Sequence, residues 1–395
     1  MSAAPLRVFI VAGEESGDQL GAPLMRALQA GGPCEFAGVG GAAMQAEGLS
    51  SLFPLADIAV MGFIPVLKRL PTLLARIDAT AKAALAFMPD VLVIIDSPDF
   101  THRVARKVRA ARPDLPIVDY VCPSVWAWRP KRAPKMRAYV DHVLCLLPFE
   151  PDALARLGGP PGTYVGHSLV ERAAALTPDA EERAARDAAP STVLILPGSR
   201  RSELDRLLPV FRDALAALVD AKGPVDAILP AVAKHRAAIA AAIESWPIRP
   251  RLVEGEAAKY AAFRRARAAL AASGTVTLEL ALAGVPSVVA YKVSRLEEAI
   301  ARRLVIVPSI VLPNLILGEN VYPEFIQSDC RADSLARAMA DLLDDGSARA
   351  AQRAGLARVA ERLAPPGGRA PAARAAAIVR ALAEGGRAAI VEGRA

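Results

Sequence analysis

Two carboxylates follow a short, continuous apolar run in the first third of the sequence. Residues 91–95 read VLVII, and DSPD follows them at 96–99. An unbroken apolar run of this length is typical of a strand buried on both faces of a parallel sheet. Open α/β sheets bind ligands at the carboxyl ends of their strands, so Asp96 is expected to face a ligand. Asp99 has a second interpretation, as the cap of a helix over 101–112.

The residue types do not indicate a metal site or a bound cofactor. A proline separates Asp96 from Asp99, and no third ligand lies near them in the sequence. The cysteines are scattered without CxxC spacing, which favours neither a zinc site nor a disulfide framework; they are Cys34, Cys122, Cys145 and Cys330.

A Ser-Gly-Thr sequence opens a predicted helix in the second half of the chain. Ser273, Gly274 and Thr275 follow an apolar run, and a helix N-terminus with exposed N–H groups suits a diphosphate. Glu279 lies one turn into the same helix, where it would reach a ribose diol. The alternative for Glu279 is an ordinary solvent-facing position.

A glycine turn in the same half supplies a complementary group. Gly198 and Ser199 precede Arg200 after the apolar run TVLIL. A guanidinium can hold pyrophosphate oxygens bidentately and stabilise a departing diphosphate.

Aromatic and basic side chains alternate between 123 and 137. Trp126 and Trp128 come just before Arg129, Lys131 and Arg132. This pattern fits an anionic, partly apolar ligand or a membrane interface, although one of the two tryptophans is expected to lie in the core.

Two more candidates follow predicted strands. A strand over 7–12 leads into GEESGD, where Ser16 would cap a helix over 20–30. His167 follows a glycine at the end of another strand and is open to both a site role and a packing role.

Pro98 predicts an extended conformation for Ser97 and the end of the strand that begins at residue 91.

One apolar segment is unusual for a core helix. Residues 59–77 contain Gly62, Pro65 and Pro71 together with basic side chains. An amphipathic surface element in contact with lipid tolerates such breaks. An irregular helix packed at the sheet edge is the other interpretation.

Length and charge restrict the class of protein. The chain has 395 residues, which predicts two domains, and β and α patterns alternate in both halves around a polar linker at 171–190. The net charge of +7 calls for an anionic partner. Aromatic residues make up only 5%, and no nucleic-acid motif is present, which argues against nucleic acid. No signal peptide is recognised, and the apolar segment 304–317 is too short to span a bilayer.

A series of short motifs resembles the lipid-A-disaccharide synthase family of glycosyltransferases. The resemblance covers about residues 7 to 385 and rests on motifs in the family's order: GEESGD (13–18), DSPDF (96–100), PSVWAWRPKR (123–132), LPFE (147–150), YVGH (164–167), LPGSR (196–200), SGTVTLE (273–279) and PNLILGENVYPEFIQ (313–327).

The resemblance implies a GT-B type α/β fold, with two Rossmann-like doubly wound domains facing each other across a cleft. An acceptor-binding domain is expected over 1–170 and a UDP-sugar-binding domain over 190–364. The last helices, at about 365–395, are expected to return to the first domain. Some members of the family form homodimers by exchanging C-terminal parts.

The resemblance also implies an inverting, metal-independent transfer. UDP-2,3-diacylglucosamine would donate its sugar to 2,3-diacylglucosamine 1-phosphate, giving a β-1,6-linked disaccharide phosphate and UDP. Asp96 would be the general base, and Glu14 and Asn314 match other residues that the family needs. Arg200, Ser273, Gly274, Thr275 and Glu279 match its nucleotide site. The expected location is the cytoplasmic face of the inner membrane, with peripheral attachment to an anionic surface.

Other assignments stay open at this point. The same fold serves other UDP-sugar enzymes, such as a UDP-N-acetylglucosamine 2-epimerase or a peptidoglycan-precursor glycosyltransferase. A nucleotide-regulated membrane-surface binding protein would bind UDP without turnover. The sequence also leaves open which of Glu14, Asp96 and Asp99 takes the proton.

Overall fold

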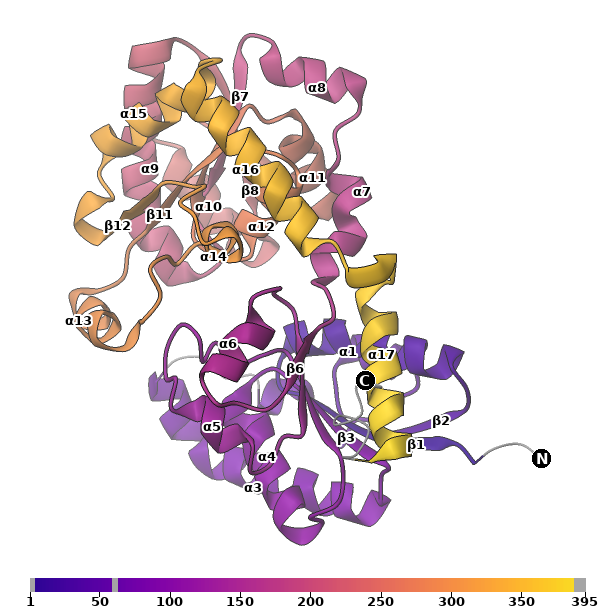
Figure 1. Ribbon diagram of the computed structural model, residues 1–395. Helices are drawn as coiled ribbons and strands as arrows, with labels where there is room; N and C mark the ends of the chain where they lie inside the picture. The colour runs from indigo at the N-terminus through magenta and orange to yellow at the C-terminus, as the bar shows by residue number, and fades with distance from the viewer. Residues whose placement is uncertain (1–3, 59–62, 387–395) are drawn as a thin grey trace. The chain divides into compact units, whose positions relative to one another are not determined.

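The computed structural model describes residues 4–58 and 63–386, which form two compact units. The first unit holds the chain up to Ser168 and again from Pro365 onward, and the second runs from Leu169 to Ala364. Each unit is built on a six-stranded parallel sheet with helices packed on its faces (Figure 1). The structure thus confirms the predicted doubly wound α/β fold of both halves.

The first sheet has the strand order β2-β1-β3-β4-β5-β6. Its strands are β1 (Leu6–Ala12), β2 (Cys34–Val39), β3 (Val91–Ile95), β4 (Ile117–Tyr120), β5 (His142–Cys145) and β6 (Gly162–Tyr164). The order reverses direction between β1 and β3, which pair in parallel from Val8↔Val91 to Ala12↔Ile95. Such a switch point opens a crevice at the carboxyl ends of the two strands.

The second sheet repeats this arrangement with the order β12-β11-β10-β7-β8-β9. Its strands are β7 (Ser191–Leu196), β8 (Val225–Ala231), β9 (Arg251–Glu254), β10 (Ala268–Ala272), β11 (Ser287–Tyr291) and β12 (Glu324–Ile326). Here the switch point lies between β7 and β10. The loops after these two strands are therefore the expected ligand edge of the second unit.

The helices cover both sheets. The first unit contains α1 (Glu15–Ala30), α2 (Ala42–Ala46), α3 (Phe63–Phe87), α4 (Pro98–Ala111), α5 (Arg132–Met136), α6 (Glu150–Arg156) and α17 (Pro371–Gly385). The second contains α7 (Ala173–Leu176), α8 (Ala180–Asp187), α9 (Arg201–Lys222), α10 (Arg236–Ile243), α11 (Glu256–Arg265), α12 (Val276–Leu282), α13 (Arg295–Leu304), α14 (Leu312–Leu317), α15 (Ala332–Leu343) and α16 (Ser347–Leu363). Over the described ranges, none of the helices combines the length and the apolar character needed to cross a bilayer.

The C-terminal helix α17 belongs to the first unit, where it packs along α1 (Figure 1). Ile378, Val379 and Leu382 enter the same apolar core as strands β1 and β3. Arg380 donates hydrogen bonds to the carbonyl oxygens of Leu28 and Gly32, at 2.6 and 3.0 Å. These bonds satisfy carbonyls at the C-terminal end of α1, which has no basic residue in its last turn.

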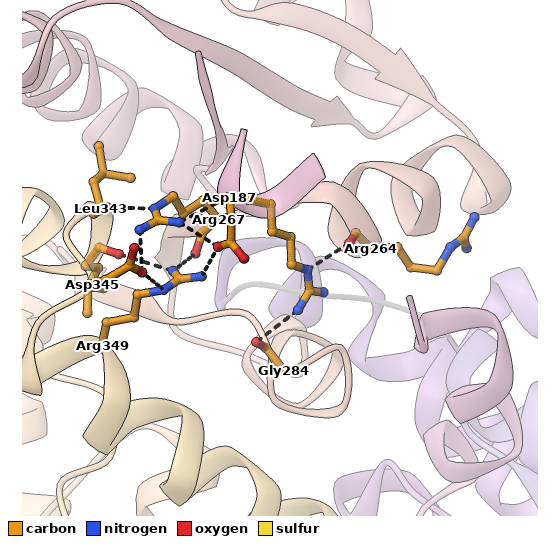
Figure 2. Close-up of polar contacts among 9 residues, drawn as sticks. Asp187, Arg264, Arg267, Gly284, Leu343, Asp345 and Arg349 are labelled. Atoms are coloured by element: carbon orange, nitrogen blue, oxygen red, sulfur yellow. Dashed lines mark hydrogen bonds and ion pairs between the residues drawn. The ribbon is translucent and has the colours of Figure 1, made fainter. Parts of the chain in front are cut away.

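Residues 171–190, predicted as a linker, are an ordered part of the second unit. They form α7 and α8, and a buried guanidinium ties the end of α8 to the rest of the fold (Figure 2). Arg267 donates to Asp187, Asp345 and the carbonyl of Leu343, at 2.7, 2.7 and 2.6 Å. Arg349 donates to the carbonyl of Arg267 at 2.7 Å. The polar, alanine-rich composition of residues 171–190 does not indicate these hydrogen bonds and ion pairs, because they involve residues far away in the sequence.

Three helix boundaries differ from the sequence prediction. Helix α1 begins at Glu15, so Ser16 lies in its first turn and is not its cap. Helix α4 begins at Pro98, where the fixed φ of proline suits the first turn. From Phe63 the predicted broken segment 59–77 is one helix that continues through Pro71, while residues 59–62 lie outside the described range.

Candidate functional site

Asp96 and Ser97 form a strained corner between β3 and α4. Both have positive φ, 54° and 45°, so the predicted extended conformation of Ser97 is wrong. The Ser97 N–H donates to Asp96 Oδ1 at 2.7 Å, and Thr101 Oγ1 donates to the Asp96 carbonyl at 2.6 Å. These bonds hold a conformation that a non-glycine residue rarely adopts. Such strain is concentrated at functional sites.

The corner brings three predicted residues together at the switch point of the first sheet. Ser16 Oγ lies 2.6 Å from Glu14 Oε1 and 3.1 Å from Asp96 Oδ2. A hydroxyl carries one proton, and the shorter contact assigns it to Glu14. Asp96 Oδ2 is then left with acceptor capacity for a substrate hydroxyl.

Gly13 and Asp18 explain the rest of the GEESGD motif. A Cβ on Gly13 would lie 2.2 Å from the Ser97 Cβ, so only glycine lets β1 approach the corner. Asp18 is fully buried and accepts hydrogen bonds from the N–H groups of Gly41 and Met44, at 2.7 and 3.0 Å. Its role is to hold the start of α2.

Asp99 lies apart from this group and faces solvent. Arg132 donates to its Oδ1 at 2.8 Å, and 79% of the Asp99 side chain is exposed. Beside it, a cavity of about 250 Å³ is lined by Ile58, Leu70, Leu73, Leu74, Ile77, Ser97, Pro98, Asp99, Phe100 and Arg103. An apolar cavity next to a carboxylate corner suits a ligand with both a polar head and an apolar tail.

The two predicted tryptophans have different environments. Trp126 is buried, and its Nε1 donates to Glu150 Oε1 at 3.1 Å, so it is the expected core tryptophan. Trp128 is exposed, and the Arg129 guanidinium lies 4.1 Å from its ring centre. Lys131 is also exposed. This surface presents an aromatic face with cations next to it.

Glu150, the last residue of LPFE, holds the loop that follows β5. Besides Trp126, the N–H groups of Leu146 and Leu147 donate to its carboxylate, both at 3.0 Å. The described residues include one group that could geometrically hold a metal ion, Cys122, Cys145 and Glu150. The spacing of the cysteines did not reveal this proximity. Because three N–H donors already occupy the Glu150 carboxylate, its evident role is to fix the loop.

Glu150 should make stability depend on pH. Burial raises its pKa from 4.5 to about 7, so the native state keeps a proton that the unfolded chain loses above pH 4.5. The raised pKa stabilises the native state fully below pH 4.5, and this contribution is lost as pH rises through 7. The unfolding free energy of wild type minus that of Glu150→Gln should therefore fall by about 2–3 kcal/mol between pH 5 and pH 8.

Urea unfolding followed by circular dichroism at the two pH values measures this difference. Glu35→Gln, at a half-exposed carboxylate on β2, is the control for a generic change of charge. A difference that stays constant with pH would mean that Glu150 is already ionised at pH 5.

His167 lies at the end of the YVGH motif in the first unit. Burial lowers its pKa to about 4, so it is neutral at pH 7. A packing role, one of its two interpretations, agrees with this environment.

The second unit has a cavity of about 540 Å³ at its own switch point. It is lined by residues that follow β7 and β10, and includes every residue predicted for the nucleotide: Gly198, Ser199, Arg200, Ser273, Gly274, Thr275 and Glu279. The first helical bonds of α12 are donated by Thr277 and Leu278 to the carbonyls of Gly274 and Thr275. The N–H groups ahead of them point out of the helix, as an anion site requires.

A buried carboxylate shapes the glycine turn of this cavity. Glu203 accepts hydrogen bonds from the N–H groups of Ser199 and Arg200, at 3.0 and 3.1 Å. These two amides are therefore occupied. Arg200 Nη1 also donates to Glu203 at 2.9 Å, but 62% of the Arg200 side chain is exposed. Its other N–H groups can reach a ligand.

Glu279 is buried, so the solvent-facing alternative is wrong. Lys259 Nζ lies 2.8 and 3.0 Å from its two carboxylate oxygens, and Tyr260 Oη lies 3.4 Å from Oε1. Lys259 also lines the cavity. Sequence reasoning missed Lys259 because it lies in an ordinary helical pattern, far from any motif.

Asn314 belongs to the second unit and holds its loops in place. Its Nδ2 donates to the Tyr322 carbonyl at 2.9 Å and to Glu324 Oε1 at 3.0 Å. Glu324 Oε2 accepts from the N–H of Ile310, whose carbonyl accepts from Ser273 Oγ, at 3.0 and 2.7 Å. A chain of hydrogen bonds thus links Asn314 through Glu324 and Ile310 to Ser273 in the lining of the cavity.

Comparison with known proteins gives a consistent result over almost the whole chain. A family model described as lipid-A-disaccharide synthetase matches residues 8–378. The chain is 54% identical over 375 residues to a lipid-A-disaccharide synthase of Nitrobacter hamburgensis, covering 94% of each chain. It is 56% identical over 354 residues to that of Nitrobacter winogradskyi, covering 89% of each.

Solved structures share the fold at low identity. The UDP-N-acetylglucosamine 2-epimerase of Neisseria meningitidis, bound to UDP-N-acetylglucosamine, has a TM-score of 0.59 and 11% identity, covering 95% of this chain and 98% of its own. MurG of Acinetobacter baumannii has a TM-score of 0.57 and 13% identity, covering 95% and 99%. These likenesses concern the fold and confirm the predicted GT-B type.

Proposed function

The chain belongs to the lipid-A-disaccharide synthase family, and we propose that it transfers 2,3-diacylglucosamine from UDP-2,3-diacylglucosamine to the 6-hydroxyl of 2,3-diacylglucosamine 1-phosphate. The products are a β-1,6-linked disaccharide 1-phosphate and UDP. The observation that carries the proposal is the pair of switch-point sites. A carboxylate with free acceptor capacity lies in one unit, and a cavity with an arginine and free helix amides lies in the other.

Transfer by a single displacement needs one base and stabilisation of one leaving group. The acceptor O6–H gives its proton to Asp96 as O6 forms a bond to C1 of the donor sugar. The bond from C1 to the β-phosphate oxygen breaks, and its electron pair leaves with UDP. Arg200 and the free amides at Gly274 and Thr275 stabilise the negative charge that develops on the diphosphate. Attack opposite to the leaving group inverts C1.

The remaining predicted residues suit the acylated acceptor. The apolar cavity between α3 and α4 lies beside the Asp96 corner, and Leu70 and Leu74 of α3 are exposed. Arg129, Lys131 and Trp128 offer cations and an aromatic face to a phosphate at a lipid–water boundary. These features support peripheral attachment to the anionic cytoplasmic face of the inner membrane. Formation of a homodimer stays a prediction from the family resemblance.

Release of UDP from purified protein tests the proposal. UDP should appear only when both UDP-2,3-diacylglucosamine and 2,3-diacylglucosamine 1-phosphate are present in detergent, and it should still appear with EDTA. Conversion of UDP-N-acetylglucosamine to its 2-epimer, without the acceptor lipid, would support an epimerase instead. If the protein bound UDP but catalysed neither reaction, it would be a nucleotide-binding protein and not an enzyme.

A further inference from the structure

Helix α13 exposes an apolar face that the proposed reaction does not yet explain. Leu296, Ile300 and Leu304 recur at every fourth position and are 72%, 50% and 41% exposed. Ile306 extends the exposed stretch beyond the helix. No residue of α13 is buried. In Figure 1 the helix stands out from the body of the second unit as a separate arm.

The opposite side of α13 lines a cavity of about 650 Å³. Its apolar walls are formed by α13, by the segment that follows it and by the end of β12: Ala301, Val305, Val307, Pro308, Ile310 and Ile326. This volume lies in the usual range for ligand cavities, about 300–1,000 Å³. Polar and charged side chains also line the cavity, among them Glu298, Arg302 and Asp329.

This apolar cavity adjoins the nucleotide cavity. Ser273 and Ile310 line both of them. The Ser273 hydroxyl donates to the Ile310 carbonyl at 2.7 Å, so this contact forms the ridge between the two spaces. A ligand with its diphosphate at Gly274 and Thr275 therefore has the apolar cavity directly beyond Ser273.

The start of α13 is held by polar contacts to Gln327 and to α9. Gln327 accepts from the Val293 N–H at 2.7 Å and donates to Glu298 at 2.6 Å. A capping box joins Ser294 and Glu297, and Arg206 of α9 pairs with Glu297 at 3.1 Å. These contacts fix the start of the helix that forms one wall, which lowers the cost of ordering that wall when an apolar ligand binds.

We propose that this cavity binds an acyl chain of the nucleotide-linked lipid donor, with Ser273 and Ile310 separating the chain from the diphosphate. The inference rests on the proposed function, since it assigns the tail of the same donor. The apolar residues of the lining offer a hydrocarbon chain a wall without hydrogen-bonding groups, while charged side chains such as Glu298, Arg302 and Asp329 line the rest of the cavity. The outward Leu296 face is not part of this site.

Water-soluble donors with short acyl chains test the site without any membrane or micelle. In a series of UDP-diacylglucosamines with chains of about four to eight carbons, each buried methylene should tighten binding about fourfold. Wild type should show this rise by calorimetry, with UDP and UDP-N-acetylglucosamine as chainless references. We call the ratio of the affinities for the eight-carbon and four-carbon donors the chain-length gain. Ala301→Phe, which fills the cavity, should reduce this gain at least about tenfold and leave UDP affinity unchanged.

Leu296→Ser on the outward face of the same helix is the matched control, and it should keep the full chain-length gain. If Ala301→Phe loses UDP binding through misfolding, Val307→Phe from the following segment repeats the test. A gain that persists in a folded filling variant, or that disappears equally in Leu296→Ser, would overturn the site. UDP binding and turnover with no chain-length gain would overturn it while leaving the proposed function intact. Absence of UDP binding in wild type would overturn both.

Discussion

Replacing Asp96 by Asn should lower kcat about 10²- to 10⁴-fold, the usual contribution of a general base. The amide keeps the size of the side chain and can still accept from the Ser97 N–H through its oxygen. It cannot take a proton from the acceptor hydroxyl at neutral pH. Because Asp96 lies in the first unit and the nucleotide cavity in the second, the affinity for UDP should stay within about twofold of wild type. Initial rates of UDP release and calorimetric titration with UDP measure the two effects.

Neighbouring acids provide the controls. Asp99→Asn removes an exposed carboxylate whose partner is Arg132, and it should lower kcat less than about tenfold. Glu14→Gln should have an intermediate effect, because Ser16 would lose its stronger acceptor and turn its hydroxyl towards Asp96. Release that persists in Asp96→Asn but is lost in Glu14→Gln would make Glu14 the base. Loss of UDP binding in Asp96→Asn would show that the substitution damages the fold.

The arrangement of both sheets could be predicted because it rests on short-range patterns. Apolar runs such as 91–95 and 268–272 are buried strands, and the turns that follow them carry the motif residues. The alternation of strands and helices then leaves few ways to order a parallel sheet. The amino-acid pattern alone therefore predicts that the motif residues after these strands lie at the carboxyl edge of each sheet, where ligands bind.

What the sequence could not show depends on contacts between distant segments. Lys259 pairs with Glu279 across 20 positions, and Arg267 reaches Asp345 and Leu343 from the start of β10. Nothing in the local pattern around Lys259 or Arg267 marks these partners. The sequence also did not predict the positive φ of Ser97. A proline normally favours an extended conformation of the residue before it, but here hydrogen bonds to Asp96 and Thr101 hold Ser97 in the left-handed region.

Replacing Glu279 by Gln should weaken UDP binding about 10- to 100-fold, because a hydrogen bond to a charged group contributes about 1.5–3 kcal/mol. The carboxylate is buried in the nucleotide cavity and is held in place by Lys259. An ionised carboxylate has about four acceptor positions, which leaves room for ribose hydroxyls beside the Lys259 ammonium. The amide of Gln offers fewer acceptors and turns a donor towards Lys259 or the sugar.

Comparison of UDP with 2′-deoxy-UDP separates ribose recognition from a general disturbance of the cavity. Wild type should prefer UDP about tenfold, whereas Glu279→Gln should bind both with similar, low affinity. Glu254→Gln is the matched control, since Glu254 is an exposed carboxylate at the end of β9 that pairs with Arg236 and does not line the cavity, and the variant should keep the preference. Equal affinity of wild type for the two nucleotides would show that the ribose 2′-hydroxyl makes no contact that contributes to binding. Glu279 would then serve to fix Lys259, and Lys259→Met should weaken UDP binding as much as Glu279→Gln does.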